Sequence, residues 1–522
     1  MTNLRRTSLE ASTIAAARQR DRIDADIAGA FAAIVGESHV LTSFDERLAY
    51  ARDRLPFAVF EERAGEIAGD VPRLIVRPGN ADEVAKVVAH AHRHRIPIIP
   101  YGNGSGVLGG AIPLGGEITV DLRRLDRIVA INETDATVTV EAGMNGAVFE
   151  QELNAAGFTT GHYPQSIEIS TVGGWAACRG GGQASSRYGK IEDIVVGLKA
   201  VLPDGTPLEV RPVARRSVGP SVRDIIVGGE GAFGVITELT LRIWKKPEIE
   251  RGVVLAFPSL QAALDSARAI MQAEIRPQIV RLYDRAESEE RTKDIALFRD
   301  KPFLAVLAFC GSEPLVTVEQ EAALKIAAVF GGEVTSDEPY RHWKQNRYIA
   351  YSQMWHDKGY FNDTIEVTAN WSKIPALYDA IARAVRAVHP DVHFGAHWSH
   401  VYPEGACQYM TVRLPPMPEA QALPLHARLW DTVESLTLDH GGSIAHHHGA
   451  GLFRSRWMAR ELGAGLGVLQ AVKDALDPDN LLNPGKLGLR ARQGAKDIYA
   501  KGLAKGLAKD LAKSDAKGAH GG

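Results

Sequence analysis

Cysteine is scarce in this chain of 522 residues, which contains only Cys178, Cys310 and Cys407. The three are an odd number and lie far apart, so they match neither a disulfide framework nor the close spacing of a zinc site. We therefore expect a reducing compartment, most simply a cytoplasm. The chain also lacks any apolar run of about 18 residues or more, so the sequence predicts no membrane-spanning helix.

Charge of one sign is not in excess either. The 60 lysines and arginines nearly balance the 63 aspartates and glutamates, giving a net charge of −3, which argues against a nucleic-acid-binding protein. Apolar residues make up 45% of the chain and charged residues 24%, as in ordinary globular proteins. The length favours at least two domains.

The two ends carry no recognisable targeting signal. Arg5 and Arg6 form a twin arginine, but no apolar segment follows them, so we do not expect secretion. The last residues, GAHGG, are not a peroxisomal address, which again favours the cytoplasm. Before them, lysines recur every fourth residue from Lys501 to Lys517. We expect a solvated tail there, with a basic helix on an anionic membrane surface as the alternative.

Short apolar runs and helical patterns alternate along the chain, as in an α+β protein. Residues 71–106 contain a strand, a helix with Asn80 as its cap, a second strand and a glycine loop. Further strands follow, with a hairpin turn at Asp204 and Gly205. The pattern of predicted elements changes near residue 249, after which strands alternate with long helices. The sequence therefore predicts a helical extension (1–45), a first domain (46–248), a second domain (249–440), a segment that returns to the first domain (441–490) and a tail rich in Lys, Ala and Gly (491–522).

Three glycine-rich segments predict a cofactor site. The first, PYGNGSGVLGG, contains G-x-G-x-x-G at Gly104, Gly106 and Gly109. A Rossmann unit needs a helix directly after this pattern, because the helix N-terminus binds the pyrophosphate. Here a strand follows instead, so we do not expect a Rossmann unit. Main-chain N–H groups of such loops can also converge on an anion without a helix. With similar loops at 166–189 and 228–238, we predict a long, flat cofactor bound by the main chain.

Three consecutive histidines lie in SIAHHHGAG. Successive side chains of a strand face opposite sides, so His446 and His448 could share a face and His447 could not. The triplet alone would then be unable to close a tetrahedral metal site. A metal would need other ligands, and the candidates are His393, His397 and His400. We therefore predict no metal.

Seven segments between about residues 45 and 490 carry a family resemblance: PYGNGSG, TTGHYPQSIEISTVGGWAACR, YGKIEDIVVGLKAVLPDG, GEGAFGVITELTLRI, IVRLYD, EGACQYMTV and GGSIAHHHGAG. The set resembles the vanillyl-alcohol-oxidase/PCMH flavoprotein superfamily, and within it the alkyldihydroxyacetonephosphate synthase (alkylglycerone-phosphate synthase) family. The resemblance implies an α+β fold, with a PCMH-type FAD-binding domain of two α/β subdomains and an α+β substrate-capping domain.

The resemblance also implies which residues line FAD. They are Pro100, Tyr101, Gly102, Asn103, Gly104, Ser105 and Gly106; Gln165, Ser166, Ile167, Glu168, Ile169, Ser170 and Thr171; Cys178, Arg179, Gly180 and Gly181; and Glu230, Gly231, Ala232, Phe233, Gly234, Val235 and Ile236. Many relatives attach FAD covalently to a histidine at the place where this chain has Ser105. Non-covalent FAD is therefore implied.

Tyr409 is the catalytic group that the resemblance implies. It stands about where related metal-assisted 2-hydroxy-acid dehydrogenases have the last histidine of G-H-x-G-D-G-N-x-H, and where the synthases have a tyrosine acid/base. A phenol with a pKa near 10 becomes a base when a neighbouring donor stabilises the phenolate, so we expect cationic or donating histidines beside it. The other implied catalytic residues are His162, Arg281, His446, His447 and His448, with His446 on the supporting side. Its apolar neighbours in QIVRLYD predict that Arg281 is buried and paired.

One position departs from the synthase pattern. The synthases bind the acidic group of their substrate with an arginine, whose place falls here on Ser352 or Gln353. An arginine fork is the natural clamp for phosphate or carboxylate, so this departure leaves a phosphate-bearing substrate unsupported. Arg347 is close in sequence and could substitute.

Three functions stay open at this point. In a synthase, Tyr409 takes a proton from a carbon next to a carbonyl, flavin N5 captures that carbon, and a long-chain alcohol displaces the acyl group to give an ether-lipid precursor. In an oxidase or dehydrogenase, Tyr409 deprotonates an alcohol or hydroxy acid while hydride passes to N5. In a flavoprotein without turnover, Tyr409 is structural. We predict a synthase-like FAD enzyme that acts on a small-molecule or lipid-like substrate and forms a homodimer.

Overall fold

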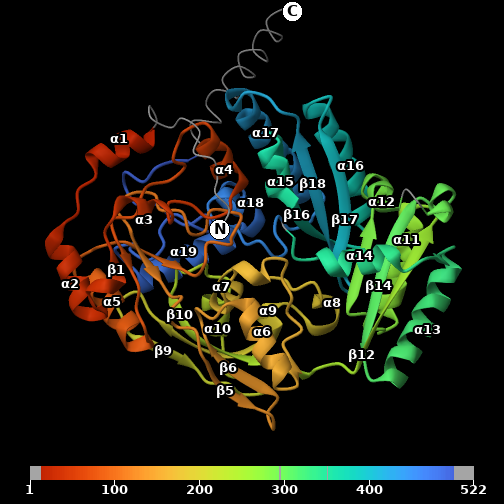
Figure 1. Ribbon diagram of the computed structural model, residues 1–522, viewed down its shortest axis with the longest axis horizontal. Coiled ribbons are helices and arrows are strands. Elements are labelled where there is room, and N and C mark those ends of the chain that lie inside the picture. Colours follow the sequence, from red (N-terminus) through yellow and green to blue (C-terminus); the bar gives the residue numbers. More distant parts are fainter. Residues whose placement is uncertain (1–12, 293–294, 350, 499–522) are drawn as a thin grey trace, which may run out of the picture.

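The computed structural model describes residues 13–292, 295–349 and 351–498 (Figure 1). The twin arginine and the lysine repeat lie outside this part of the chain. Three larger sheets and a two-stranded ribbon organise the described residues. The α+β class expected from the sequence is therefore present.

The first sheet has the strand order β1-β2-β4-β3 and consists of β1 (Val40–Leu41), β2 (Ile75–Val76), β4 (Ile118–Asp121) and β3 (Ile98–Tyr101). Helix α5 (Ala81–Arg93) connects β2 to β3, and both strands run parallel to β4. Asn80 caps α5 as predicted, because its side chain accepts the N–H of Glu83 at 2.9 Å. The glycine loop after β3 leads into β4 without a helix, so the rejection of a Rossmann unit is confirmed.

The N-terminal region is helical as expected, but its end belongs to the core. Helices α1 (Thr13–Arg20) and α2 (Ala25–Val35) precede β1. Phe31 of α2 is fully buried and lies in one apolar cluster with Val84 and Val87 of α5. β1 then pairs with β2 as an edge strand. The sequence did not predict these core contacts, because alanine dominates this region and only a few large apolar residues make them.

The second sheet is antiparallel, with the order β5-β6-β10-β8-β9; its strands are β5 (Ile128–Asn132), β6 (Thr137–Glu141), β10 (Val235–Arg242), β8 (Val195–Val201) and β9 (Pro207–Val210). The predicted hairpin turn is confirmed, since β8 pairs with β9 and Gly205 has a φ of 93°. A ribbon of β7 (Phe158–Thr159) and β11 (Trp244–Lys245) lies beside it. The helices of this region are α3 (Phe44–Leu48), α4 (Pro56–Arg63), α6 (Gly146–Ala155), α7 (Val172–Ala177), α8 (Ser185–Tyr188), α9 (Ile191–Ile194) and α10 (Arg223–Ile226).

The third sheet has seven strands in the order β15-β12-β14-β13-β17-β18-β16: β15 (Glu333–Val334), β12 (Ile249–Phe257), β14 (Phe303–Gly311), β13 (Ile279–Tyr283), β17 (His393–Val401), β18 (Gly405–Leu414) and β16 (Phe361–Asn370). One face is covered by α11 (Leu260–Gln272), α13 (Glu313–Val329), α16 (Ile374–Val388) and α17 (Glu419–Asp439) (Figure 1). The shorter helices are α12 (Arg285–Thr292), α14 (Glu338–Asn346) and α15 (Tyr351–Asp357). The opposite face carries polar side chains.

The last described segment returns to the first sheet. It contains α18 (Met458–Leu462) and α19 (Ala464–Leu476). The N–H of Ile98 in β3 binds the carbonyl of Leu481, and the carbonyl of Ile98 accepts the N–H of Asn483, both at 2.8 Å. The histidine triplet lies between α17 and α18, so it is held between the third sheet and the glycine loops.

Candidate active site

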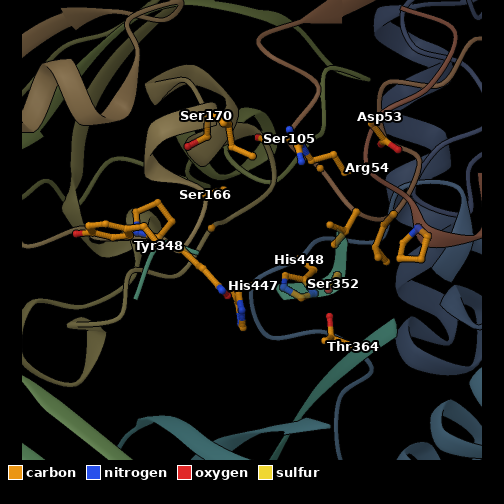
Figure 2. Close-up of a pocket in the computed structure, with 18 of the residues that line it drawn as sticks. Asp53, Arg54, Ser105, Ser166, Ser170, Tyr348, Ser352, Thr364, His447 and His448 are labelled. Carbon is orange, nitrogen blue, oxygen red and sulfur yellow. The ribbon is translucent and has the colours of Figure 1, made fainter. Parts of the chain in front are cut away.

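A cavity of about 2540 Å³ lies between the glycine loops and the polar face of the third sheet. Pockets for one small ligand usually measure about 300–1,000 Å³, so this cavity has room for a large cofactor and a substrate together. Figure 2 shows Ser105, Ser166 and Ser170 on one side of it and His447 and Thr364 on the other. The cavity therefore joins the two sets of residues that the sequence singled out.

The first glycine loop presents its main chain to this cavity. Gly104 has a φ of 59°, and a Cβ on Gly102 would lie 2.3 Å from Oγ1 of Thr171 in the second loop. The N–H groups of residues 103–107 donate no hydrogen bond to another protein group in the described part of the chain. Unpaired N–H groups of a glycine loop form an anion-binding concavity, so these loops fit a phosphate-bearing cofactor such as FAD.

Most residues predicted to line FAD line the cavity. They are Pro100, Tyr101, Gly102, Asn103, Gly104, Ser105, Gly106, Gln165, Ser166, Glu168, Ile169, Ser170, Thr171, Cys178, Gly180, Gly181, Glu230, Gly231, Gly234 and Ile236.

Five residues predicted to line FAD do not line this cavity. Ile167, Ala232, Phe233 and Val235 are buried in the apolar core. Arg179 is exposed, and its Nε donates to the carbonyl of Val227 at 3.3 Å. Neighbouring side chains of a loop or strand point in different directions, so a continuous stretch of sequence cannot all face one ligand.

Tyr409 lies on the polar face of the third sheet and lines the cavity. It lies on β18, directly opposite Glu366 of β16 on one side and His397 of β17 on the other. Its hydroxyl donates to Oγ1 of Thr364 at 3.0 Å. All three strands point these residues into the cavity side of the sheet, because side chains opposite one another share a face.

Histidine rings surround the phenol. The ring of His397 stacks on Tyr409 with centroids 4.9 Å apart, and that of His447 stacks at 6.0 Å. His448 meets the phenol edge-on at 5.6 Å. The sequence-based expectation of histidines beside Tyr409 is therefore confirmed in its geometry.

Of the two alternatives expected from the sequence, cationic or donating histidines, the lowered pKa values of the imidazoles beside Tyr409 disfavour the cationic one. Burial is the main cause that lowers the pKa of the imidazoles around Tyr409, and nearby arginine, lysine and histidine side chains add to it; these imidazoles are His397, His400, His446, His447 and His448. Burial also raises the pKa of the Tyr409 phenol well above its ordinary value. Closely packed imidazoles in a dry cavity favour their neutral form. The cluster therefore does not stabilise a phenolate through positive charge.

Glu366 fixes the histidine triplet. Its carboxylate accepts the main-chain N–H groups of His446, His447 and His448 at 2.6, 3.4 and 3.1 Å. Nη1 of the fully buried Arg454 donates to the same carboxylate at 2.9 Å. Burial acts to raise the pKa of Glu366, but Arg454 and the N–H donors outweigh it and lower that pKa. A turn, not a strand, therefore carries the triplet.

This turn overturns the geometric argument against a metal. The Nδ1 atoms of His446 and His447 lie 2.9 Å apart. Together with Cys407 and Glu366 they form a group whose ligand atoms all lie within 4.8 Å of one another, a donor set that zinc accepts. Glu366 is, however, already bound by Arg454 and three N–H groups, and burial raises the pKa of the Cys407 thiol well above its ordinary value. The same residues therefore serve in the structure as a hydrogen-bonded cluster.

The remaining predicted catalytic residues are divided between the cavity and its surroundings. Arg281 lines the cavity and is half-buried; its Nε donates to the hydroxyl of Tyr283 and its Nη2 to Nε2 of His397, both at 2.9 Å. It is therefore paired as predicted, but with neutral partners. His446 lies off the cavity, and its Nε2 contacts the hydroxyl of Tyr402 at 2.9 Å.

His162 also lies off the cavity. It is fully buried, its ring packs on Trp175 with centroids 4.8 Å apart, and neither ring nitrogen has a partner among the described residues. Burial lowers its pKa to about 3. The structure thus places His162 behind the second glycine loop instead of against a substrate.

Sequence reasoning missed Thr364, Glu366 and Arg454. A signal for the first two exists in FNDTIEVTAN, where polar residues at every second position alternate with Ile365 and Val367. Such alternation predicts a strand with one polar face. No local signal distinguishes Arg454 from a surface arginine, because its partners lie on other elements.

Comparisons with known proteins agree with this geometry. Residues 72–211 match the FAD binding domain family, and residues 246–487 match the C-terminal domain of FAD linked oxidases. The alkyldihydroxyacetonephosphate synthase of Caenorhabditis elegans is 31% identical over 457 residues, which cover 79% of this chain and 76% of that protein. The uncharacterized FAD-linked oxidoreductase YgcU of Escherichia coli strain K12 is 30% identical over 470 residues, which cover 87% of this chain and 96% of that protein.

Among solved structures, an alkyldihydroxyacetonephosphate synthase superimposes with a TM-score of 0.75 at 23% identity, covering 89% of this chain and 85% of that one. This likeness shows the PCMH-type fold. None of the helices in the described residues is both long and apolar enough to cross a membrane. The chain is an FAD-dependent enzyme and belongs to the FAD-linked oxidase family of PCMH-type flavoproteins that includes alkyldihydroxyacetonephosphate synthase.

Proposed function

We propose that this enzyme catalyses a reaction of the alkyldihydroxyacetonephosphate synthase type, in which a long-chain alcohol replaces the acyl group of an acylated ketone phosphate. The observation that carries the proposal is the position of Tyr409 on the cavity face of the third sheet, with the rings of His397 and His447 stacked beside it. The similarity to the Caenorhabditis elegans synthase supports the same reaction class. When bound, FAD supplies an electrophilic isoalloxazine ring.

Tyr409 acts in this proposal as the acid/base. Its phenol oxygen takes a proton from the carbon beside the ketone as it passes its own proton to a neutral imidazole, so that no free phenolate has to form. His448 is the proposed acceptor, since its Nδ1 is buried and has no hydrogen-bond partner among the described residues. Thr364 orients the phenol through the 3.0 Å hydrogen bond. Arg281 orients His397, which packs against the same ring.

The alternative is an FAD-linked oxidoreductase acting on a hydroxy acid or alcohol. One observation favours it: neither residue at the place of the synthase arginine is a cation, since Ser352 accepts a hydrogen bond from Asn362 at 3.3 Å and Gln353 donates to Asp357 at 2.8 Å. In this version Tyr409 would take the hydroxyl proton, and bound FAD would supply the hydride acceptor. The similarity to an Escherichia coli oxidoreductase suits this reaction.

Anaerobic titration of the holoenzyme separates the two functions. Acyl-dihydroxyacetone phosphate is expected to perturb the flavin absorbance without bleaching it, and hydroxy acids or aryl alcohols are expected to leave it oxidised. Bleaching by a hydroxy compound would replace the proposed function with the oxidoreductase. No response to any of them would count against both.

We also propose that FAD is held without a covalent bond, because Ser105 stands on the cavity wall where a histidine would be needed (Figure 2). Acid precipitation of the purified enzyme is expected to leave the yellow flavin in the supernatant. A yellow pellet would show a covalent bond at another residue.

A further inference from the structure

Arg413 is a buried cation on the same face of the third sheet as Tyr409. The two residues are four positions apart on β18, and residues at every second position of a strand share a face. Arg413 lines the cavity, and only 7% of its surface is exposed. Its guanidinium lies over the ring of Trp355, 3.5 Å from the centroid.

No acidic partner neutralises this guanidinium. Across residues 13–292, 295–349 and 351–498, Arg413 forms no ion pair, and its Nε has no hydrogen-bond partner. Glu287 and Glu290 are the acidic groups that act on it from a distance, and Glu287 is already paired with Arg291 at 2.7 Å. Arginine stays protonated in proteins, and a buried charge is costly unless it is paired. An anion arriving from the cavity would remove that cost.

Other arginines that line the cavity differ from Arg413. Arg63 pairs with Glu419 at 3.3 Å, and Arg52 pairs with Glu62 at 2.6 Å. Arg347, the substitute suggested by sequence position, is half-buried among the rings of Tyr163, Trp343 and Tyr348, 4.8 to 5.9 Å away. Arg413, by contrast, is buried, its guanidinium has no ion-pair partner among the described residues, and it lies on the same face of β18 as Tyr409.

Arg413 lies near Ser352, one of the two candidate positions for the arginine of the synthase pattern, where this chain has no cation. Ser352 and Trp355 are three residues apart on α15, so they lie on the same side of that helix. Asn362 stands directly opposite Arg413 on β16, and its side chain donates to Ser352. The guanidinium of Arg413, which extends from β18, therefore lies near the place that a cationic side chain at position 352 of α15 would occupy.

We infer that Arg413 binds the anionic group of the substrate, a phosphate or a carboxylate, with Trp355 holding the guanidinium flat and Asn362 beside it. This inference rests on the proposed function and specifies its substrate. The Cα atoms of Tyr409 and Arg413 are about 13 Å apart along the strand. This spacing favours a substrate that carries its anion several bonds from the reacting carbon over a 2-hydroxy acid, whose carboxylate adjoins that carbon.

Calorimetric titration of the FAD-loaded enzyme tests the inference without requiring turnover. The ligands are dihydroxyacetone phosphate, glutarate and uncharged dihydroxyacetone. The variants are Arg413→Gln, Arg413→Lys as the conservative change, and Lys358→Gln as the matched control, because Lys358 is an exposed cation 5.1 Å from the same Trp355 ring. Flavin content checks that each variant is folded.

In the wild type we expect one or both anions to bind, and the tighter one identifies phosphate or carboxylate as the natural group. Arg413→Gln should weaken the affinity for that anion at least tenfold, and Arg413→Lys should weaken it less. The affinity of Lys358→Gln should stay within twofold of the wild-type value. Failure of both anions to bind, or equal losses for the anion and for dihydroxyacetone, would overturn the inference. Anion binding that depends on Arg413 in an enzyme bleached by a hydroxy compound would instead keep this site and reject the synthase reaction.

Discussion

Glu366 and Tyr409 face each other across the paired strands β16 and β18. Glu366 also accepts the N–H groups of all three histidines in the turn after α17. One register of one strand pair thus places a buried carboxylate, the phenol and the imidazoles around the phenol. The position of the acid/base follows from the sheet, and the position of its neighbours follows from a hydrogen-bonded turn.

Tyr409→Phe should abolish most of the turnover while leaving FAD bound. Within the described part of the chain the hydroxyl hydrogen-bonds to Thr364 alone, so its loss removes proton transfer with little effect on packing. General acid/base catalysis contributes about 10²- to 10⁴-fold, and kcat should fall by that range. Tyr188→Phe is the control, since its hydroxyl contacts Cys310 off the cavity. Turnover above half of the wild-type value in Tyr409→Phe would make Tyr409 structural.

Glu366→Gln should destabilise the fold strongly. The change leaves Arg454 with less compensating charge in a fully buried place and turns an amide group toward N–H donors. Breaking one partner of a buried ion pair costs about 3–5 kcal/mol, which urea unfolding would measure. Glu289→Gln, in the exposed pair with Arg285, should cost less than about 0.5 kcal/mol. Similar unfolding midpoints for the two variants would refute the role given to Glu366.

His162 should make the enzyme sensitive to acid. Its folded pKa is about 3, against about 6.5 in an unfolded chain. Below about pH 6.5 the unfolded state therefore binds a proton that the folded state does not, and His162 lowers stability by about 1.4 kcal/mol for each further pH unit down to its folded pKa. Unfolding curves at pH 8 and pH 5 should show His162→Phe gaining on the wild type as pH falls. A pH-independent difference would mean that His162 has partners in solution.

Gly102→Ala should lower the affinity for FAD. The added Cβ would lie 2.3 Å from Oγ1 of Thr171, which forces the first two glycine loops apart where they line the cavity. We expect reduced flavin content after purification and a raised Kd for FAD in fluorescence titration. Gly467→Ala in α19 is the control, because nothing lies within 4 Å of the added Cβ. Full flavin content in Gly102→Ala would place the cofactor away from this loop.

The sequence by itself determined the local elements and the loops. Asn80 caps a helix through its own side chain, and Gly205 turns a hairpin through its own backbone, so both could be predicted from a few neighbouring residues. The glycine segments and the tyrosine strand could also be placed on one site, because seven separate stretches resemble one family. These features depend on interactions within about ten residues or on motifs that keep their order along the chain.

Only the tertiary structure decided the charges and partners of the site. The histidine triplet looked like a strand, but a carboxylate from β16 holds it in a turn. The sequence left its imidazoles open as cations or as neutral donors, but burial among one another lowers their pKa values and favours the neutral form. Arg413 looked like any strand arginine until the sheet placed it in line with Tyr409. Strand register and burial bring together residues that are far apart in sequence. They determine which way a side chain points and whether it is protonated, so no local sequence pattern could specify these two properties.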